Sequence, residues 1–185
     1  MVNNMMITET KLKGVKIIEP DVFSDERGLF VKPFHKDTMK KNGMIGNFEE
    51  SFYSISNKNV IRGMHFQSPP QDHAKLVYVP RGKILDIVLD IRKRSPTYGQ
   101  FVEVELSDSN HKMIYIPSGF AHGFISLEDQ SCTTYLQSTM RSAEHEGGIH
   151  MNSFGMKWNV EKPIISTRDQ AFPRLGDFNT PFILQ

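Results

Sequence analysis

The chain has 185 residues, with 22 Lys and Arg against 21 Asp and Glu, which gives a formal net charge of +1. A chain of this length fits one domain, which can bury roughly 70% of its unfolded surface without a disulfide or a metal. The near-neutral charge argues against a general nucleic-acid binder. The single cysteine excludes an intrachain disulfide framework and a cysteine zinc cluster. The apolar runs are too short to cross a bilayer.

The middle of the chain consists of short apolar runs separated by turn residues. The run 100–106 alternates clearly, with Val102, Val104 and Leu106 on one face and Glu103 and Glu105 on the other. Turns recur about every 8 to 12 residues, which is typical of a sandwich or barrel. Further runs lie at 77–80, 83–90, 113–116 and 124–127, and the best helical pattern is short, at 35–41. The sequence therefore predicts an all-β barrel or jelly roll with a few short helices.

The two ends of the chain differ from its middle. Residues 1–13 are polar and would add an edge strand to a partner subunit, while the segment 160–185 carries three prolines and would wrap the barrel. No basic region precedes an apolar core at the N-terminus, so we expect no secretory signal and a cytoplasmic protein. We treat 1–185 as a single domain.

The stretch 59–67 is the most informative part of the sequence, because it reads as a strand with Gly63 inside it. In a regular strand His65 and Gln67 share one face and Arg62 points to the other. A bulge at Gly63 would re-aim a neighbour, and a long arginine could also reach over the rim. His65 is a candidate general base; the alternative is a hydrogen-bonded structural histidine.

Two further runs place charged side chains on apolar faces. Lys75 shares a face with Val77 and Val79, so it is either a buried cation that needs an anionic partner or a lysine whose ammonium reaches water. Asp86 shares a face with Val88 and either pairs with Lys75 or a histidine, or lies in solvent at a strand end.

The turn at 117–119 delivers His122 into the following strand, where it lies either in the barrel or on a wet rim. Tyr135 shares a polar strand face with Thr133 and Gln137, which suits a wet cavity or the solvent face of an edge strand. Arg27, in a turn at 25–28, either grips a phosphate or is solvated. The seven histidines include no His-x-His pair, so we expect no catalytic metal.

Together these stretches resemble the dTDP-4-dehydrorhamnose 3,5-epimerase (RmlC-like) family over about residues 10–175. Each motif alone is weak, but in this order and spacing they are specific. The motifs are Asp25-Glu26-Arg27-Gly28, Arg62-Gly63-Met64-His65-Phe66-Gln67, Lys75-Leu76-Val77, Ser95-Pro96-Thr97-Tyr98-Gly99, Ile116 to Phe124, Glu146-Gly147-Gly148 and Pro163 to Asp169.

The resemblance implies a metal-free, cofactor-free cupin-type jelly roll. It also implies a homodimer that exchanges N-terminal strands, and a nucleotide-linked 4-keto-6-deoxy sugar as substrate. By resemblance His65 is the base, Asp169 its carboxylate partner, Lys75 the cation at the enolate oxygen and Tyr135 the acid. The resemblance gives the remaining site residues binding roles: Arg27 and Arg62 grip phosphate, and Gln67, His122, Asp86 and Glu50 line the site.

This assignment agrees with the chemistry of enolisation. A hydrogen next to a ketone is acidic only because the enolate places charge on oxygen, where a lysine ammonium stabilises it. Inversion needs a base on one face of the carbon and an acid on the other, and a tyrosine with a reference pKa of about 10 is protonated at neutral pH. Neither step needs a metal or a redox cofactor.

The sequence departs from the family pattern in two places. Glu50, Ser51 and Phe52 occupy the positions of a Gln-acid-Asn run, and Met140 and Arg141 those of two aromatics. These flanks leave three functions open: 3,5-epimerisation of dTDP-4-dehydro-6-deoxyglucose, epimerisation at C3 or C5 alone or on a CDP- or GDP-linked sugar, and non-catalytic nucleotide-sugar binding.

Overall fold

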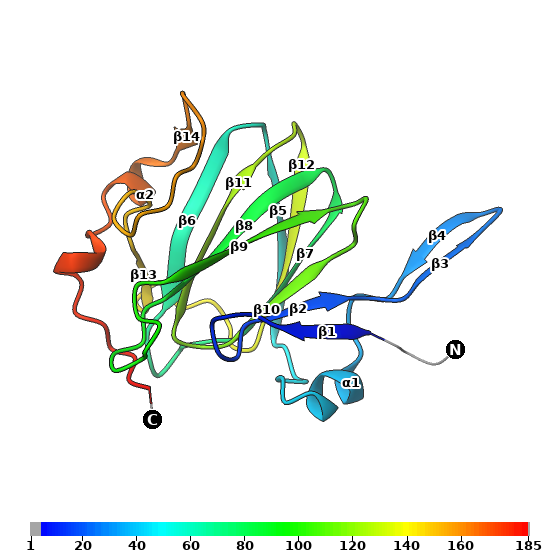
Figure 1. The fold of residues 1–185 in the computed structure, drawn as a ribbon, viewed down its shortest axis with the longest axis horizontal. Coiled ribbons are helices and arrows are strands. Elements are labelled where there is room, and N and C mark those ends of the chain that lie inside the picture. The colour runs from blue at the N-terminus through cyan, green and yellow to red at the C-terminus, as the bar shows by residue number, and fades with distance from the viewer. Residues whose placement is uncertain (1–4, 185) are drawn as a thin grey trace.

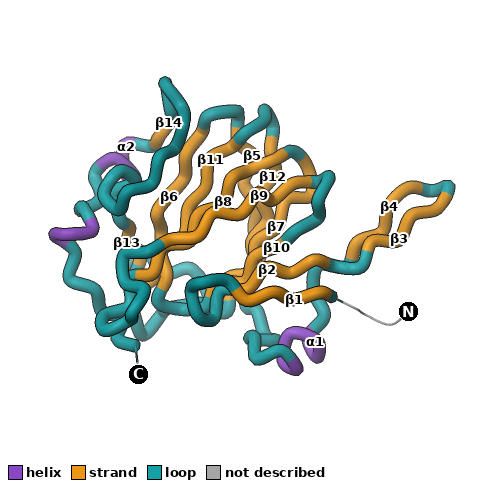
Figure 2. The backbone as a smooth tube through the Cα atoms, in the orientation of Figure 1, coloured by secondary structure: helices purple, strands orange, loops and turns teal. Residues whose placement is uncertain are grey.

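The computed structural model describes residues 5–184, and its strands form two facing sheets (Figures 1 and 2). The first sheet has the order β1-β2-β10-β7-β12-β5, and the second has the order β13-β6-β11-β8-β9 with β14 paired to β6. The first sheet contains β1 (Met6–Glu9), β2 (Lys16–Glu19), β5 (Glu50–Ser56), β7 (Lys75–Arg81), β10 (Met113–Ile116) and β12 (Ser131–Gln137). The second contains β6 (Val60–Gln67), β8 (Lys83–Asp90), β9 (Phe101–Ser107), β11 (Phe120–Ser126), β13 (Glu146–Gly148) and β14 (Ile164–Ile165).

The expected all-β fold is confirmed, and the strand chemistry explains it. In β9 the valines and Leu106 face inward while Glu103 and Glu105 are exposed, as the alternation predicts. The central strand β11 is buried along its whole length, so its sequence does not alternate between apolar and polar residues as that of a half-exposed strand does. The expected helix is α1 (Lys36–Lys41); His35 caps it, and Met39 is its one buried residue.

Apolar side chains pack in three layers, one between the two sheets and one on the outer face of each sheet. One layer fills the space between them and includes Val77, Val88, Ile114 and Phe124. A second lies outside the β6 sheet, where the C-terminal segment contributes Phe182. The third lies between the other sheet and α1. With both faces covered, polar side chains that point between the sheets lie in a poorly solvated interior.

Two segments lie outside the barrel. β3 (Val22–Asp25) and β4 (Gly28–Val31) form a hairpin that projects away from it (Figure 1). The C-terminal segment follows the β6 and β13 side of the barrel, with β14, α2 (Thr167–Gln170) and η1 (Leu175–Asp177) along it. In the expected exchanged segment, residues 1–4 lie outside the described part, and β1 pairs with β2 of its own chain. No helix within residues 5–184 is long and apolar enough to cross a membrane.

A bulge interrupts β6 at Gly63, as the sequence allowed. His65 pairs with His122 and Arg62 with Phe124, so two residues of β6 face one of β11. Gly63 has φ +130°, and a Cβ there would lie 2.5 Å from the Cα of Gly123. The extra residue shifts the alternation, so Arg62 and His65 line the same cavity.

Replacing Gly63 by alanine is expected to lower the free energy of unfolding by at least about 2 kcal/mol, because the new Cβ meets backbone atoms and the φ angle disfavours a side chain. Urea denaturation monitored by fluorescence measures this loss. Gly155→Ala is the matched control, since Gly155 also has a positive φ, of +88°, but open space around it. Equal losses in the two variants would show that the contact with Gly123 contributes nothing.

Candidate active site

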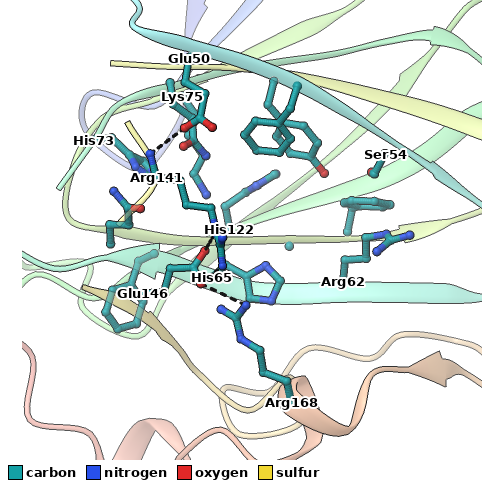
Figure 3. A pocket seen from close by; sticks show the side chains of 17 residues that line it. Glu50, Ser54, Arg62, His65, His73, Lys75, His122, Arg141, Glu146 and Arg168 are labelled. Atoms are coloured by element: carbon teal, nitrogen blue, oxygen red, sulfur yellow. Dashed lines mark hydrogen bonds and ion pairs between the residues drawn. The ribbon is translucent and has the colours of Figure 1, made fainter. Parts of the chain in front are cut away.

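A cavity of about 440 Å³ lies between the two sheets, and the two walls carry different chemistry (Figure 3). The β6 sheet contributes Arg62, His65 and His122, and the opposite sheet contributes Lys75 and Tyr135. The cavity is therefore lined by groups that would reach a bound molecule from two sides.

His65 is held by a carboxylate from the far end of the chain. Its Nε2 lies 2.9 Å from Asp169 Oδ1, and the Gly63 N–H donates to Asp169 Oδ2 at 3.0 Å. Asp169 reaches this place because β14 pairs in parallel with β6 and leads directly into α2. A carboxylate only accepts, so Nε2 carries the ring proton and Nδ1 is the basic nitrogen of the neutral imidazole.

The electrostatics of this pair favour an ionised carboxylate. Burial alone would raise the pKa of Asp169, but the hydrogen bonds from His65 and Gly63 outweigh it and hold the pKa below its ordinary value. His65 is about one-third exposed while Asp169 is buried. The ring is thus fixed from behind and open to the cavity.

A second histidine–carboxylate pair lies deeper. His122 Nε2 is 2.7 Å from Asp86 Oδ2, and both side chains are buried. Burial lowers the pKa of His122, and the attraction of Asp86 offsets this only in part, so the ring is neutral at pH 7. The second oxygen of Asp86, Oδ1, has no hydrogen-bond partner among the described residues.

Lys75 is a buried cation, as one interpretation of its strand face predicted. Burial lowers its pKa to about 8, and the negative charges of Asp86 and Glu146 act in the opposite direction. The amine is therefore mostly protonated at pH 7, and it loses its proton more easily than a solvated lysine does. Such a group stabilises an oxyanion more strongly than a solvated lysine does.

Tyr135 lies in β12, which pairs with β7 on one side and with the edge strand β5 on the other, and its side chain is buried and borders the cavity rather than solvent. Phe52 stacks on its ring at 4.7 Å between centroids, and His122 meets it edge-on at 6.1 Å. Burial raises the pKa of Tyr135, and the charge of Asp86 adds to this effect. The phenol is therefore a proton donor at neutral pH.

The rim of the cavity carries a network of ion pairs (Figure 3). The Arg141 guanidinium binds both oxygens of Glu146 at 2.9 and 3.1 Å, and Arg168 approaches the same carboxylate at 3.2 Å. The backbone N–H of Arg141 donates to Glu50 at 2.7 Å. Gln67 anchors the same loop by accepting from the Ser142 N–H at 2.7 Å.

The remaining predicted binding residues divide into two groups. Arg62 lines the cavity, and its Nε donates to Ser56 at 3.0 Å. Arg27 does not reach the cavity within one chain: it lies on the exposed β3–β4 hairpin, paired with Asp25. Residues 5–184 bring no three His, Cys, Asp or Glu side chains together to hold a metal ion.

The family model for dTDP-4-dehydrorhamnose 3,5-epimerase matches residues 9–177. The chain belongs to this family. The enzyme of that name from Methanothermobacter thermautotrophicus is 40% identical over 175 residues, covering 91% of this chain and 94% of its own. These matches confirm the family and the isomerase class that the sequence motifs predicted.

Solved structures of the family share the fold. An RmlC epimerase from Legionella pneumophila, in complex with dTDP-4-keto-L-rhamnose, is 34% identical with a TM-score of 0.94, covering 98% of this chain and all of its own. ChmJ, a 3'-monoepimerase from Streptomyces bikiniensis, is 27% identical with a TM-score of 0.86, covering 90% and 86%. The cupin-type jelly roll expected from the sequence is confirmed.

The site residues predicted from the sequence left out several side chains that line this cavity, among them Glu146, Arg168 and His73. His73 is buried and lines the cavity, yet it was not among the predicted site residues. The signal was present, because His73 precedes Lys75 by two residues and so continues the face that Lys75 shares with Val77.

The depressed pKa of Lys75 makes a prediction about stability. The unfolded chain holds this proton up to about pH 10.4 and the folded chain only to about pH 8, so the unfolded state binds more protons in between. The stability of the wild type should therefore rise across this range relative to Lys75→Met, by up to about 3 kcal/mol. Urea denaturation at pH 7.5, 9 and 10.5 measures it, and Lys58→Met, at an exposed lysine, should show no such trend.

Proposed function

We propose that this protein inverts C3 and C5 of dTDP-4-dehydro-6-deoxyglucose by removing and returning protons next to the ketone. The observation that carries the proposal is the placement of His65 and Tyr135 on opposite sheets around one cavity that also holds the buried Lys75. A base and an acid on opposite sides of a carbon are what inversion requires.

The proposed steps conserve protons and charge. His65 Nδ1 takes the hydrogen from the carbon next to the ketone, and the C–H electron pair forms a carbon–carbon double bond while the carbonyl becomes an enolate oxygen. The Lys75 ammonium stabilises that oxygen. The Tyr135 hydroxyl then gives its proton to the same carbon from the opposite side, and the carbonyl re-forms. The tyrosinate regains a proton from solvent and the His65 imidazolium releases its proton to solvent, so both groups return to their starting states. Asp169 stabilises the imidazolium formed in between.

Nucleotide binding would use the arginines at the cavity and its rim. A diphosphate matches the planar fork of a guanidinium better than an ammonium. We assign this task to Arg62, with Gln67 and Glu50 shaping the loop beside it through the hydrogen bonds they make. His122 and Asp86, on the β6 sheet, would act across the cavity: the charge of Asp86 stabilises the Lys75 ammonium, and the His122 ring packs edge-on against Tyr135.

We propose a homodimer as the working unit, in the cytoplasm. The β3–β4 hairpin exposes four large apolar side chains, Val22, Phe23, Leu29 and Phe30. An exposed apolar patch of this kind is typical of a protein–protein interface. Covered by a second copy, the hairpin would carry Arg27 away from its own barrel and toward the partner's cavity. Size-exclusion chromatography with light scattering tests the dimer.

A second candidate is epimerisation at one carbon only. Phe52 and Arg141 line the cavity where the family pattern has other residue types, and the fold is also that of the monoepimerase ChmJ. Proton NMR of dTDP-4-keto-6-deoxyglucose with the protein in deuterated water separates the two candidates. Loss of the C3 and C5 signals supports 3,5-epimerisation, and loss of one supports the second candidate. Loss of neither, with an active family enzyme as control, contradicts both.

Two variants are expected to separate proton removal from inversion. His65→Ala should slow hydrogen exchange at least about 10³-fold, since the base is lost. Tyr135→Phe retains the base, so exchange should continue while inversion falls at least about 10²-fold. Exchange is read by NMR and inversion by the coupling constants of the product. A Tyr135→Phe variant that still inverts at the wild-type rate would exclude Tyr135 as the acid.

A further inference from the structure

His73 is a buried polar side chain that the proposed reaction does not use. It is 8% exposed, and neither Nδ1 nor Nε2 has a hydrogen-bond partner within residues 5–184. Buried imidazoles ordinarily pair at least one ring nitrogen, because an unpaired polar group in the interior destabilises the fold. Two unpaired nitrogens on one ring therefore require an explanation.

The ring lies at the cavity rather than in closed core. His73 borders the main cavity with Lys75 and His122 (Figure 3), and it also lines a second, smaller pocket with Pro117 and Phe120. In Figure 3 the ring lies near Lys75, on the other side of the cavity from Arg62 and Ser54. A molecule that fills the cavity would meet His73 at the Lys75 end.

The loop that carries His73 is fixed on both sides of it. The Ala74 N–H donates to Ser138 Oγ at 2.9 Å and the Ala74 carbonyl accepts from the Ser138 N–H at 3.0 Å. On the other side, the Gln71 carbonyl accepts from Gln67 at 2.7 Å, and Asp72 accepts from the Ser118 hydroxyl. The imidazole is thus held in place with its nitrogens unpaired.

The charge state of the ring restricts what it can bind. Burial lowers the pKa of His73 to about 2, and the positive charge of Lys75 adds to the effect, so the ring is neutral at any pH at which the protein works. A neutral imidazole offers one donor and one acceptor and no charge. A phosphate would gain little from it, whereas a hydroxyl both donates and accepts.

We propose that His73 binds a ring hydroxyl of the substrate sugar and so contributes to specificity for the sugar rather than for the nucleotide. This inference rests on the proposed function for the kind of ligand. Arg62 on the far side is suited to the diphosphate, and Lys75 beside His73 to the C4 carbonyl, so the C3 hydroxyl next to that carbonyl, and the C2 hydroxyl one carbon further, come within reach of the Lys75 end.

The test is a binding cycle with ligands that cannot react. dTDP-quinovose has a hydroxyl in place of the ketone, and its 2-deoxy and 3-deoxy forms each lack one ring hydroxyl. Titration calorimetry with wild type, His73→Leu and His73→Gln gives the dissociation constants, with dTDP alone as reference. His73→Leu should weaken dTDP-quinovose binding about 10- to 100-fold and leave dTDP within twofold, and His73→Gln, which keeps a donor and an acceptor, should restore most of the loss.

The deoxy ligands show whether His73 contacts a sugar hydroxyl directly or affects binding only through the structure of the cavity. In the wild type one of them should bind about 10-fold or more weakly, and this penalty should vanish in His73→Leu. A penalty that persists in the variant, an equal loss for dTDP and dTDP-quinovose, or no measurable binding of dTDP-quinovose by the wild type would overturn the proposal. If His73→Leu does not fold, His73→Ala, which also lacks a donor and an acceptor, takes its place in the cycle, with His73→Gln still the variant that restores binding. Failure of the wild type to exchange hydrogen, with the cycle intact, would contradict the proposed reaction alone.

Discussion

The geometry of the site depends on one carboxylate that binds two groups of the same strand. Asp169 accepts from the Gly63 backbone N–H and from His65 Nε2. The first bond satisfies an amide that the bulge in β6 turns away from its neighbour, and the second fixes the tautomer and direction of the imidazole. Because the bulge also brings Arg62 and His65 onto one cavity, the binding and basic groups of this strand depend on the same contact.

A second set of contacts joins the two sheets through charge: Lys75 lies on β7, and Asp86 and His122 lie on β8 and β11 of the β6 sheet. The negative charges of Asp86 and Glu146 partly compensate the buried ammonium of Lys75, and His122 satisfies one oxygen of Asp86 with a hydrogen bond. The two carboxylates thus let a cation remain in a poorly solvated cavity with its pKa at about 8. A developing enolate would find there a charge that is already desolvated, which is the condition under which electrostatic stabilisation is largest.

Local patterns predicted the all-β fold because it follows from alternation and turns, whereas for the site they named candidate side chains and left their surroundings open. The strand faces of Lys75, Asp86 and Tyr135 could be derived from side-chain periodicity alone, whereas their inward direction needed the second sheet to cover them. The Asp169 contact spans 104 residues, so only the family resemblance indicated it. His73 was missed because no motif marked it. Arg27 lies apart from the cavity because the β3–β4 hairpin, whose turn carries it, projects away from the barrel of its own chain.

The departures from the family pattern divide the site into two parts. Glu50, Phe52 and Arg141 are half-buried or exposed, and the Arg141 N–H donates to Glu50, while Lys75, Tyr135, His122 and Asp169 are buried. Substitutions at a solvated rim change which groups a ligand meets on entry and cost little stability, whereas a change to a buried charged group leaves its partner uncompensated. The chemistry of proton transfer is therefore constrained by the interior, and the choice of nucleotide and sugar can vary at the rim without disturbing it.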